Sequence, residues 1–448
     1  MSSASSPVQR PRLDQSAFPS LGPGQLRSGR SIDAIDGILP QAVITPRDVE
    51  HVRDTIAEAR AKKLAIVPSG GGTRLHIGAL PREYDVRLSM TAIGDIVEQN
   101  PEDMTVTCQA GVSISRLQRS LARVGQRLAI DIANEDRASI GGVLATNNTG
   151  GLRHAFGLPR DLVLGLTAID GGGRTIIAGG RVVKNVAGYD LVRLLTGSWG
   201  GLAVLTEMTL RTHPLPAAGA TLVFEFVSPA EMDAARVRLM EQPLPLAALD
   251  FVVDASESTM LWMLIVRIEG TEEEVAYQGD RVCALVGRDP ADALEDWISP
   301  VHIDTEGGLT LRVAANPGDL VRAVRAALTR LRADGSVQSH ASVQVAGHLG
   351  AGIARFRIAD PEQEAGYDNG PDLSGRVPPS RAAFAALWAG TETGEGVRNR
   401  LLERAPRSLK QSYDVWGPPP ASLPLMRAIK RRFDPDDVLA PGRFVGGL

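Results

Sequence analysis

The sequence has 448 residues, which is enough for two or three domains. Charged residues make up 22% of it and its net charge is -4, so it offers no basic stripe for nucleic acid. Its two cysteines, Cys108 and Cys283, are too few for a disulfide framework or a four-cysteine iron–sulfur cluster. No apolar run reaches the roughly 18–20 residues that a transmembrane helix needs. These properties predict a cytoplasmic protein that has no transmembrane segment and does not bind nucleic acid.

The first 37 residues are polar and rich in Ser, Pro, Gly and Arg. They lack the apolar segment of a secretory signal, so we expect a disordered tail over residues 1–37. An organelle transit peptide is the alternative, because arginine and serine are frequent in this segment and acidic residues are few.

Residues 45–69 predict a helix followed by a buried strand. Thr45 is placed to cap the helix, and apolar residues recur along one of its faces. The strand, "LAIVPS", leads directly into three glycines at 70–72. These match neither a Walker loop, which needs Gly-Lys-Ser/Thr, nor the G-x-G-x-x-G fingerprint, because Leu75 stands at its third glycine. The glycines therefore form a plain turn, or they let a ligand's phosphates approach several backbone N–H groups.

Two further glycine-rich stretches follow, at 138–151 and 178–210. In the first, "ASIGGVLATNNTGG", Ser139 is placed to cap a short helix whose first turn contains Gly141 and Gly142. The unpaired N–H groups and the positive dipole of such a turn suit a pyrophosphate, and close packing of the helix is the alternative. Three such stretches without a Walker or Rossmann signature indicate an extended dinucleotide bound along several loops.

The pattern of elements changes after two prolines close a strand near residue 216. Residues 217–380 show strands and helices in the order β-α-β-β-α, which is typical of a ferredoxin-like α+β unit, and a further strand and helix continue it. An irregular loop is expected over 360–380. The sequence thus predicts one domain over 38–216, a second over 217–380, and a helical C-terminal segment over 381–448.

Four segments resemble, in order and spacing, the FAD-binding domain of the vanillyl-alcohol-oxidase or PCMH type. They are "PSGGGTRLHIG", "AGVSISRLQRSLARVGQRLAID", "ASIGGVLATNNTGG" and "GGRVVKNVAGYDLVRLLTGSWGGLAVLTEMTLR". The stretch "VVKNVAGYDLVRLLTGSWG" is most similar to FAD-binding subunits of glycolate oxidase and related 2-hydroxy-acid oxidases, and the ending "FDPDDVLAPGRFVGGL" resembles that family's closing segment. The resemblance implies an α+β fold: a two-lobed PCMH-type FAD-binding domain, a ferredoxin-like substrate or cap domain, and a C-terminal segment that returns to the flavin domain.

The resemblance also implies which residues bind FAD. Backbone N–H groups of residues 69–73 would bind the pyrophosphate, and the FAD would be non-covalent, because Thr73 stands where some relatives carry a flavin-tethering histidine. His76 lies three positions later, at the wrong place for such a bond. The residues expected to contact FAD are Pro68, Ser69, Gly70, Gly71, Gly72, Thr73, Gly111, Ser139, Gly141, Gly142, Val143, Leu144, Ala145, Thr146, Asn147, Gly150, Gly151 and Val204.

Two positions depart from the family pattern. The segment "GHLGAGIARFRI" resembles an "HxGDGNxH" metal motif, but only His348 remains, Ala351 replaces the acid, and Arg355 stands at the second histidine. A lone histidine is a poor metal site, so we expect no bound metal. Ala440, in "LAPGRF", stands where relatives commonly have asparagine next to the flavin.

The resemblance predicts an FAD-dependent oxidoreductase that converts a 2-hydroxy acid of the glycolate or D-lactate class to the 2-oxo acid by hydride transfer to flavin. We expect His348 to act as the base and Arg355 and Arg443 to bind the substrate carboxylate; a packing histidine and surface arginines are the alternatives. A homologous flavin subunit and an iron–sulfur subunit are the expected partners. The other hypotheses are a non-catalytic FAD-binding accessory subunit and a stand-alone alcohol oxidase that uses O₂.

Overall fold

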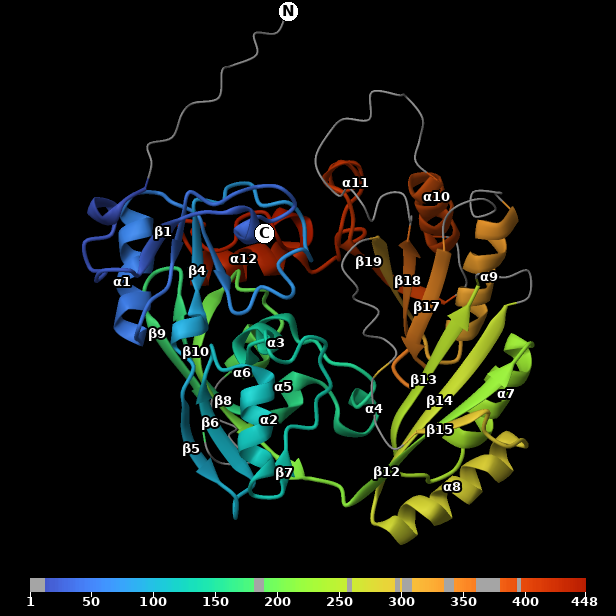
Figure 1. The fold of residues 1–448 in the computed structure, drawn as a ribbon. Helices are drawn as coiled ribbons and strands as arrows, with labels where there is room; N and C mark the ends of the chain where they lie inside the picture. The colour runs from blue at the N-terminus through green and yellow to red at the C-terminus, as the bar shows by residue number, and fades with distance from the viewer. Residues whose placement is uncertain are drawn as a thin grey trace, which may run out of the picture.

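The computed structural model describes the chain over 13–180, 189–255, 260–294, 299, 308–333, 342–359, 379–392 and 396–448. Figure 1 shows two bodies side by side: an N-terminal region with two main sheets, and a large sheet that helices cover on one face. Residues 181–188 of the third glycine-rich stretch, and most of the loop expected at 360–380, lie outside the described residues. Within these ranges, no helix is long and apolar enough to cross a membrane.

The N-terminal region contains a four-stranded sheet of order β1-β2-β4-β3 and a five-stranded sheet of order β5-β6-β10-β8-β9. Its strands are β1 (Leu26–Ser28), β2 (Ala42–Ile44), β3 (Ile66–Ser69), β4 (Val86–Ser89), β5 (Ile96–Asn100), β6 (Thr105–Gln109), β7 (Gln126–Arg127), β8 (Val163–Asp170), β9 (Thr175–Gly179), β10 (Ala203–Arg211) and β11 (His213–Pro214). Its helices are η1 (Gln15–Ala17), η2 (Ser31–Asp33), α1 (Val49–Ala61), η3 (Met90–Ala92), α2 (Ile114–Ala122), α3 (Ile140–Thr146), α4 (Arg153–Phe156), α5 (Pro159–Leu162) and α6 (Leu191–Leu195).

Helix α1 begins later than the sequence suggested. Asp48, not Thr45, is its N-cap, because the Asp48 carboxylate accepts a hydrogen bond from the backbone N–H of His51 at 2.8 Å. The prediction of Ser139 as the N-cap of α3 is confirmed, since its hydroxyl accepts from the N–H of Gly142 at 3.3 Å. The first glycine-rich segment thus follows β3, and the second one contains α3.

The disordered tail expected over residues 1–37 is wrong for residues 13–37, which form ordered structure. Strand β1 pairs antiparallel with β2, and the side chains of Phe18 and Ile35 are fully buried. The carboxylate of Asp33, also buried, accepts hydrogen bonds from Arg27 and Arg87. A few well-placed apolar residues therefore anchor a segment whose average composition is polar. Residues 1–12 lie outside the description.

The large sheet has eight strands in the order β15-β12-β14-β13-β17-β18-β16-β19. The strands are β12 (Ala218–Phe226), β13 (Leu246–Asp254), β14 (Leu261–Gly270), β15 (Asp292–Leu294), β16 (Leu309–Ala315), β17 (Ser342–His348), β18 (Ile353–Ala359) and β19 (Val397–Arg404). The helices that accompany them are α7 (Pro229–Met240), α8 (Glu272–Val286), α9 (Leu320–Ala333) and α10 (Pro379–Glu392).

Two ferredoxin-like units share this sheet. The first unit, β12 to β15, and the second, β16 to β19, each follow the order β-α-β-β-α-β along the chain. In the sheet, the strand order of the second unit is the mirror image of that of the first. Antiparallel pairing of β13 with β17 joins the two halves. The predicted ferredoxin-like unit is therefore present, and the further strand and helix that continue it begin a second copy.

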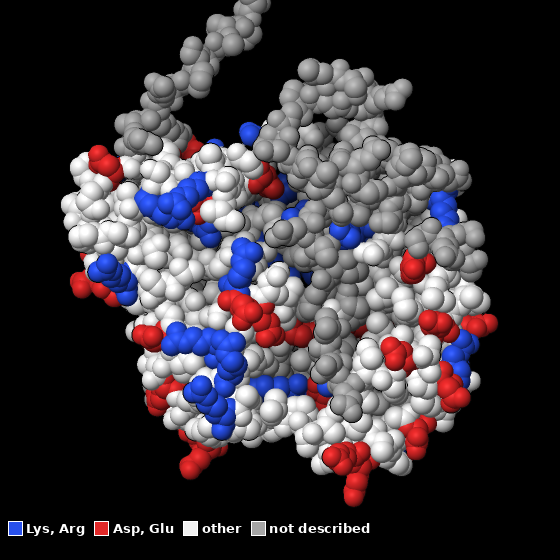
Figure 2. Space-filling view, viewed as in Figure 1, with Lys and Arg blue, Asp and Glu red and all other residues white. Residues whose placement is uncertain are grey.

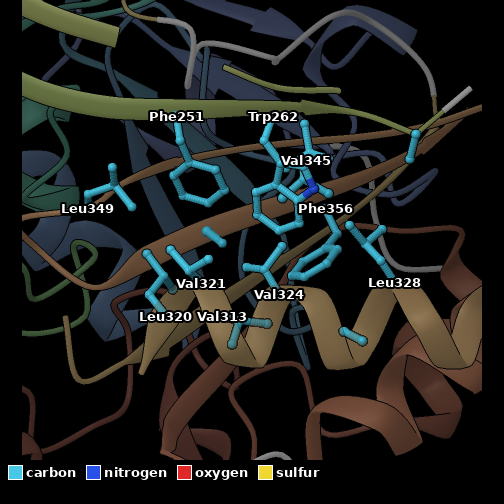
Figure 3. Packing of buried hydrophobic residues seen from close by; sticks show 14 of the residues in the cluster. Phe251, Trp262, Val313, Leu320, Val321, Val324, Leu328, Val345, Leu349 and Phe356 are labelled. Atoms are coloured by element: carbon cyan, nitrogen blue, oxygen red, sulfur yellow. The ribbon is translucent and has the colours of Figure 1, made fainter. Parts of the chain in front are cut away.

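Side chains alternate between the two faces of the large sheet, because successive residues of a strand point to opposite sides. The outer face packs against the helices and is apolar. Figure 3 shows this core, in which strand residues meet helix α9 through Phe251, Trp262, Val345, Phe356, Leu320, Val321, Val324 and Leu328. The inner face carries polar residues, among them Asp250, His348 and Arg355, and it is turned towards the N-terminal region (Figure 1).

The C-terminal segment differs from the expected helical segment over 381–448. Helix α10 covers the large sheet and β19 is an edge strand of it, paired with β16. Only after β19 does the chain return to the N-terminal region, through α11 (Arg407–Ser412), α12 (Leu423–Phe433) and η4 (Val445–Gly447). There the N–H of Ala440 donates to the carbonyl of Ile66 on β3 at 2.7 Å. Strand β19 was not predicted because its sequence, VRNRLLER, shows no alternation of apolar and polar residues.

Candidate active site

A pocket opens where β3 ends and α3 begins. The glycine loop at 70–72 forms one wall and the first turns of α3 form another. Residues from the start of β10 and from the returning C-terminal segment complete it. A pocket built from several loops suits an extended organic cofactor.

The glycines allow the two loops to touch. A Cβ atom on Gly70 would lie 1.7 Å from the Ser139 hydroxyl oxygen, and one on Gly71 would lie 1.6 Å from the Arg137 carbonyl oxygen. A Cβ on Gly141 would lie 2.7 Å from that of Ala110. Close packing, the alternative left open for these glycines, is therefore part of their role.

The backbone N–H groups of the two walls of the pocket differ in whether they already have a hydrogen-bond acceptor. At the start of α3, the N–H of Gly141 donates to the Ala110 carbonyl at 2.9 Å and that of Gly142 donates to Ser139, so both are already paired. In the described part of the chain, by contrast, the N–H groups of residues 70–73 have no acceptor. These four donors line the pocket and fit the oxygens of a pyrophosphate.

Most residues predicted to contact a cofactor lie in this pocket: Pro68, Ser69, Gly70, Gly71, Gly72, Thr73, Ser139, Gly141, Gly142, Val143, Ala145, Thr146 and Val204. Five predicted residues do not line it, and each has another structural role.

Gly111 packs against the carbonyls of Met90 and Ile93, and Leu144 is buried in the core of the N-terminal region. Asn147 ends α3 in the left-handed conformation, with φ of 49°. The N–H groups of Gly150 and Gly151 donate to the carboxylate of Asp131 at 3.0 and 2.8 Å, so they are not free for a cofactor.

One wall of the pocket is aromatic and was not predicted from the sequence. Trp199 lines it, and its ring meets Trp416 edge to face, with 5.2 Å between the centroids. The feature of the sequence that could have indicated this wall is the tryptophan before two glycines in "TGSWGG", a stretch in which only the glycines were considered as cofactor contacts. The other pocket residues absent from the predicted set are Val67, Arg74, Leu75, Met90, Ala110, Ile132, Ala138, Asn148, Gly200, Ala203 and Leu205.

Arg443 lies in this pocket and not with His348 and Arg355, with which it was grouped. Its Nη2 donates to the carbonyls of Leu75 and Ile77 at 2.7 and 2.5 Å. Burial lowers the pKa of Arg443 to about 10. Its Nη1 is buried and has no hydrogen-bond partner in the described ranges. Arg443 therefore presents an unsatisfied donor next to the cofactor pocket, and not to the inner face.

His348 forms a buried pair with Asp250 on the inner face of the large sheet. The two are directly opposite each other on β17 and β13, and Nδ1 of His348 lies 2.8 Å from Oδ1 of Asp250. Burial raises the pKa of Asp250, and the neighbouring imidazole of His348 opposes this rise. A carboxylate at Nδ1 favours the tautomer with the proton on Nδ1, which leaves Nε2 as an acceptor. No described residue donates to that Nε2, which is buried.

Arg355 forms a second buried pair on the same face. Its Nε donates to the Glu403 carboxylate at 2.8 Å, and Arg312 approaches the same carboxylate at 3.8 Å. Burial alone would raise the pKa of Glu403, but the charges of Arg355, Arg312 and Arg74 outweigh it and hold the pKa at about 2. The position of the second motif histidine is thus taken by an ion-paired arginine. No group of His, Cys, Asp and Glu among the described residues could hold a metal ion.

Helix α4 of the N-terminal region packs against β13 and brings Arg153 and His154 to this face. Burial, with the nearby charges of Arg312 and Arg355, lowers the pKa of Arg153 to about 10. Burial also lowers the pKa of His154, so a neutral imidazole is favoured there. Cofactor pocket and inner face are neighbours, because Arg74 lines the pocket and its charge acts on Glu403 and Arg312.

Two sequence families match this chain. The family described as the FAD binding domain matches residues 40–179, and the family described as the C-terminal domain of FAD linked oxidases matches residues 308–444. The chain is a PCMH-type FAD oxidoreductase. It is an FAD-dependent oxidoreductase, and the expected FAD cofactor is confirmed.

Curated relatives of this FAD oxidoreductase include hydroxy-acid enzymes. Glycolate oxidase subunit GlcD of Bacillus subtilis is 26% identical over 90% of this chain and 89% of its own length. D-2-hydroxyglutarate dehydrogenase of Stutzerimonas stutzeri is 25% identical over 90% of both chains. Glycolate oxidase subunit GlcE of Escherichia coli is 32% identical over 50% of this chain and 61% of its own length.

Solved structures share the fold. An alkyldihydroxyacetonephosphate synthase superposes with a TM-score of 0.69 at 16% identity, covering 97% of this chain and 86% of its own. The 6-hydroxy-D-nicotine oxidase of Arthrobacter nicotinovorans superposes with a TM-score of 0.63 at 16% identity, covering 93% and 96%. The predicted α+β fold with a PCMH-type FAD-binding domain is thereby confirmed.

Proposed function

We propose that this FAD oxidoreductase oxidises a 2-hydroxy acid to the 2-oxo acid at the inner face of the large sheet. The observation that carries the proposal is the buried Asp250–His348 pair, whose Nε2 has no partner in the described chain, beside the guanidinium groups of Arg312 and Arg355. An acceptor and paired arginines are the groups that the hydroxyl and the carboxylate of such a substrate need. Glycolate and D-2-hydroxyglutarate, in the names of two relatives, belong to this substrate class.

Each group has one role in the proposed reaction. Nε2 of His348 accepts the proton of the substrate hydroxyl, and Asp250 stabilises the imidazolium that results. Arg312 and Arg355 orient the carboxylate, with Glu403 holding Arg355 in place. FAD, when bound, supplies the acceptor of the hydride from the α-carbon. The unpaired N–H groups of residues 70–73 would hold its pyrophosphate non-covalently.

An anaerobic absorption spectrum tests this function. The purified holoprotein should show oxidised flavin bands that bleach on addition of a 2-hydroxy acid, tried as glycolate, D-lactate and D-2-hydroxyglutarate. His348→Gln should retain FAD and lose bleaching by about 100-fold or more in rate. Bleaching that persists at the wild-type rate in His348→Gln would contradict the proposed base. Flavin that stays oxidised with every acid would contradict the reaction.

A second candidate is an accessory flavin subunit of a larger oxidase. Its support is that this chain is similar to two different subunits of glycolate oxidase, GlcD and GlcE, and that Arg355 replaces the second motif histidine. An accessory subunit would keep its FAD and show no bleaching alone. It would then bleach, or raise turnover, only when purified with a homologous flavin subunit and an iron–sulfur subunit. Bleaching of the isolated chain by a hydroxy acid would exclude this candidate.

A further inference from the structure

A guanidinium group lies directly behind the glycine loop of the cofactor pocket. Arg87 is on β4, opposite Val67 of the neighbouring strand β3, so its side chain projects from the same face of the sheet as that of Ser69. Its Nε donates to the hydroxyl oxygen of Ser69 at 2.9 Å. A Cβ atom on Gly72 would lie 2.9 Å from its Nη2. The guanidinium group thus meets the loop at Ser69 and again at Gly72.

The N-terminal segment holds this arginine in place. The carboxylate of Asp33, in η2, accepts from Nη1 of Arg87 at 2.9 Å and from both terminal nitrogens of Arg27, at 2.6 and 2.9 Å. On the face seen in Figure 2, acidic and basic side chains are interspersed at the surface, where ion pairs are weak. The side chains of Asp33 and Arg87, by contrast, are only 1% and 11% exposed. Their contact therefore fixes the guanidinium group in one position.

The hydroxyl group of Ser69 has a hydrogen left to donate. A hydroxyl can accept and donate at the same time, and its hydrogen rotates to suit the available acceptor. Because the Ser69 oxygen accepts from the cation of Arg87, its own hydrogen points away from that cation. Ser69 lines the cofactor pocket, and no residue that the structure describes accepts this hydrogen. The hydroxyl therefore offers a donor to the pocket, next to the unpaired N–H groups of residues 70–73.

We propose that Arg87 orients the Ser69 hydroxyl as a fifth donor to the pyrophosphate of FAD, and that Asp33 keeps Arg87 in the position that this requires. The cation polarises the hydroxyl, which strengthens its hydrogen bond to a phosphate oxygen. Arg87 is a positioning residue, because it acts through Ser69. The inference concerns the cofactor, so it stands or fails independently of the proposed substrate. It also gives the N-terminal segment a role in the cofactor site.

The rate at which FAD leaves the holoprotein tests this inference. After strong dilution, the released FAD is followed by the rise of its fluorescence, without any substrate. Ser69→Ala and Arg87→Met should each accelerate release by about tenfold to 100-fold, as expected for the loss of a hydrogen bond to a charged group. The double variant should release FAD at most about threefold faster than Arg87→Met, because both changes remove the same donor. Effects that multiply would show that the two residues act separately, and would overturn the inference.

Arg236→Met is the matched control for the loss of a buried arginine. Arg236 lies on α7, is 9% exposed, and donates from Nε to Asp233 at 2.6 Å. It is not among the described residues that line the pocket. This variant should release FAD at the wild-type rate, even where its midpoint of thermal unfolding falls. If it accelerated release as much as Arg87→Met does, general destabilisation would explain both effects and the inference would fail.

Asp33→Asn tests the role of the N-terminal segment. It removes the charge that holds the guanidinium group and leaves an oxygen that accepts one hydrogen bond. Release of FAD should accelerate, by a smaller factor than in Arg87→Met. Release at the wild-type rate would show that Asp33 does not hold Arg87 for the cofactor.

A second measurement identifies the group of FAD that Ser69 meets. ADP and adenosine share the adenine and ribose of FAD and differ in the pyrophosphate. ADP should raise the unfolding midpoint of the apoprotein more than adenosine does. This advantage should shrink in Ser69→Ala, which removes a single oxygen and serves even if Arg87→Met does not fold, and it should persist in Arg236→Met. Equal effects of ADP and adenosine on the wild type, or an undiminished advantage in Ser69→Ala, would overturn the pyrophosphate contact.

Discussion

Asp250 and His348 are 98 positions apart in the sequence, yet they are directly opposite each other on β13 and β17, at the junction of the two ferredoxin-like units. Neither unit alone contains the pair. The pairing of β13 with β17, which joins the two units, therefore brings together the Asp250–His348 pair that the proposed reaction uses.

Replacing Asp250 by asparagine should lower kcat for hydroxy-acid oxidation by about 100- to 1,000-fold. The asparagine amide can donate to Nδ1, which moves the imidazole proton to Nε2 and removes the acceptor there. Steady-state kinetics should show a much smaller change in KM. A ¹⁵N spectrum of histidine-labelled protein checks the tautomer of His348 independently of activity. Unchanged kcat with an altered tautomer would refute the role of Asp250 as a positioning residue.

Glu403 should make stability depend on acid pH. Its pKa in the folded protein is about 2, below its ordinary value, so the folded state binds this proton less readily than the unfolded state. The stabilisation is present above about pH 5 and is lost as the pH falls towards 2. Glu403→Gln should unfold more easily than the wild type at pH 7, by roughly 3–5 kcal/mol, since it leaves two buried arginines without their acid.

A comparison of the wild type with Glu403→Gln at several pH values provides the control for this prediction. Denaturant unfolding at pH 7, 5, 4 and 3 should show the difference between wild type and Glu403→Gln shrinking as the pH falls. A difference that stays constant over this range would show that the Glu403 charge does not stabilise the fold.

Gly71→Ala should prevent FAD binding. The added Cβ would lie 1.6 Å from the Arg137 carbonyl oxygen, a backbone atom that cannot rotate away, so the two walls of the pocket must separate. We expect a loss of FAD affinity of about 100-fold or more and a stability loss of about 1–3 kcal/mol. Flavin fluorescence titration of the apoprotein measures the first and thermal unfolding measures the second.

Gly279→Ala is the matched control. Gly279 lies inside α8, and a Cβ there meets no atom within 4 Å. This change should leave FAD binding intact and raise stability by up to about 1 kcal/mol. If both variants behaved alike, the close approach of the glycine loop to residue 137 would not matter for the cofactor.

FAD should leave the protein completely on acid precipitation, because no histidine lines the pocket among the described residues. His76 lies outside the pocket, where its backbone carbonyl accepts a hydrogen bond from Lys410. All flavin absorbance should appear in the supernatant, and the denatured protein should show no flavin fluorescence on a gel. A fluorescent protein band would show a covalent bond and contradict the prediction.

Local features of this chain could be predicted from its sequence. Ser139 caps α3 as expected, and the strand expected directly before the three glycines is β3. Each of these features depends on residues within a few positions of one another.

The substrate side of the site could not be predicted in this way. Arg355 finds its partner Glu403 on an edge strand 48 residues away, and the strand itself was taken for helix. Arg153 was not predicted as a site residue, because it lies in α4, a helix of a single turn. The packing of α4 against β13, which places Arg153 at the inner face, cannot be inferred from the sequence. Arg443 was assigned to the substrate because its charge suits a carboxylate, and sequence alone does not show the carbonyls that it contacts.

The position of Arg443 sets an order for the assembly of the protein during its synthesis. Its guanidinium joins the wall of the cofactor pocket at Ile77, 366 residues earlier in the chain. The ribosome must therefore complete the whole large sheet, which lies between these two residues, before the pocket can close. The wall of the pocket that contains Arg443 is thus completed only after both bodies of the protein have been synthesised.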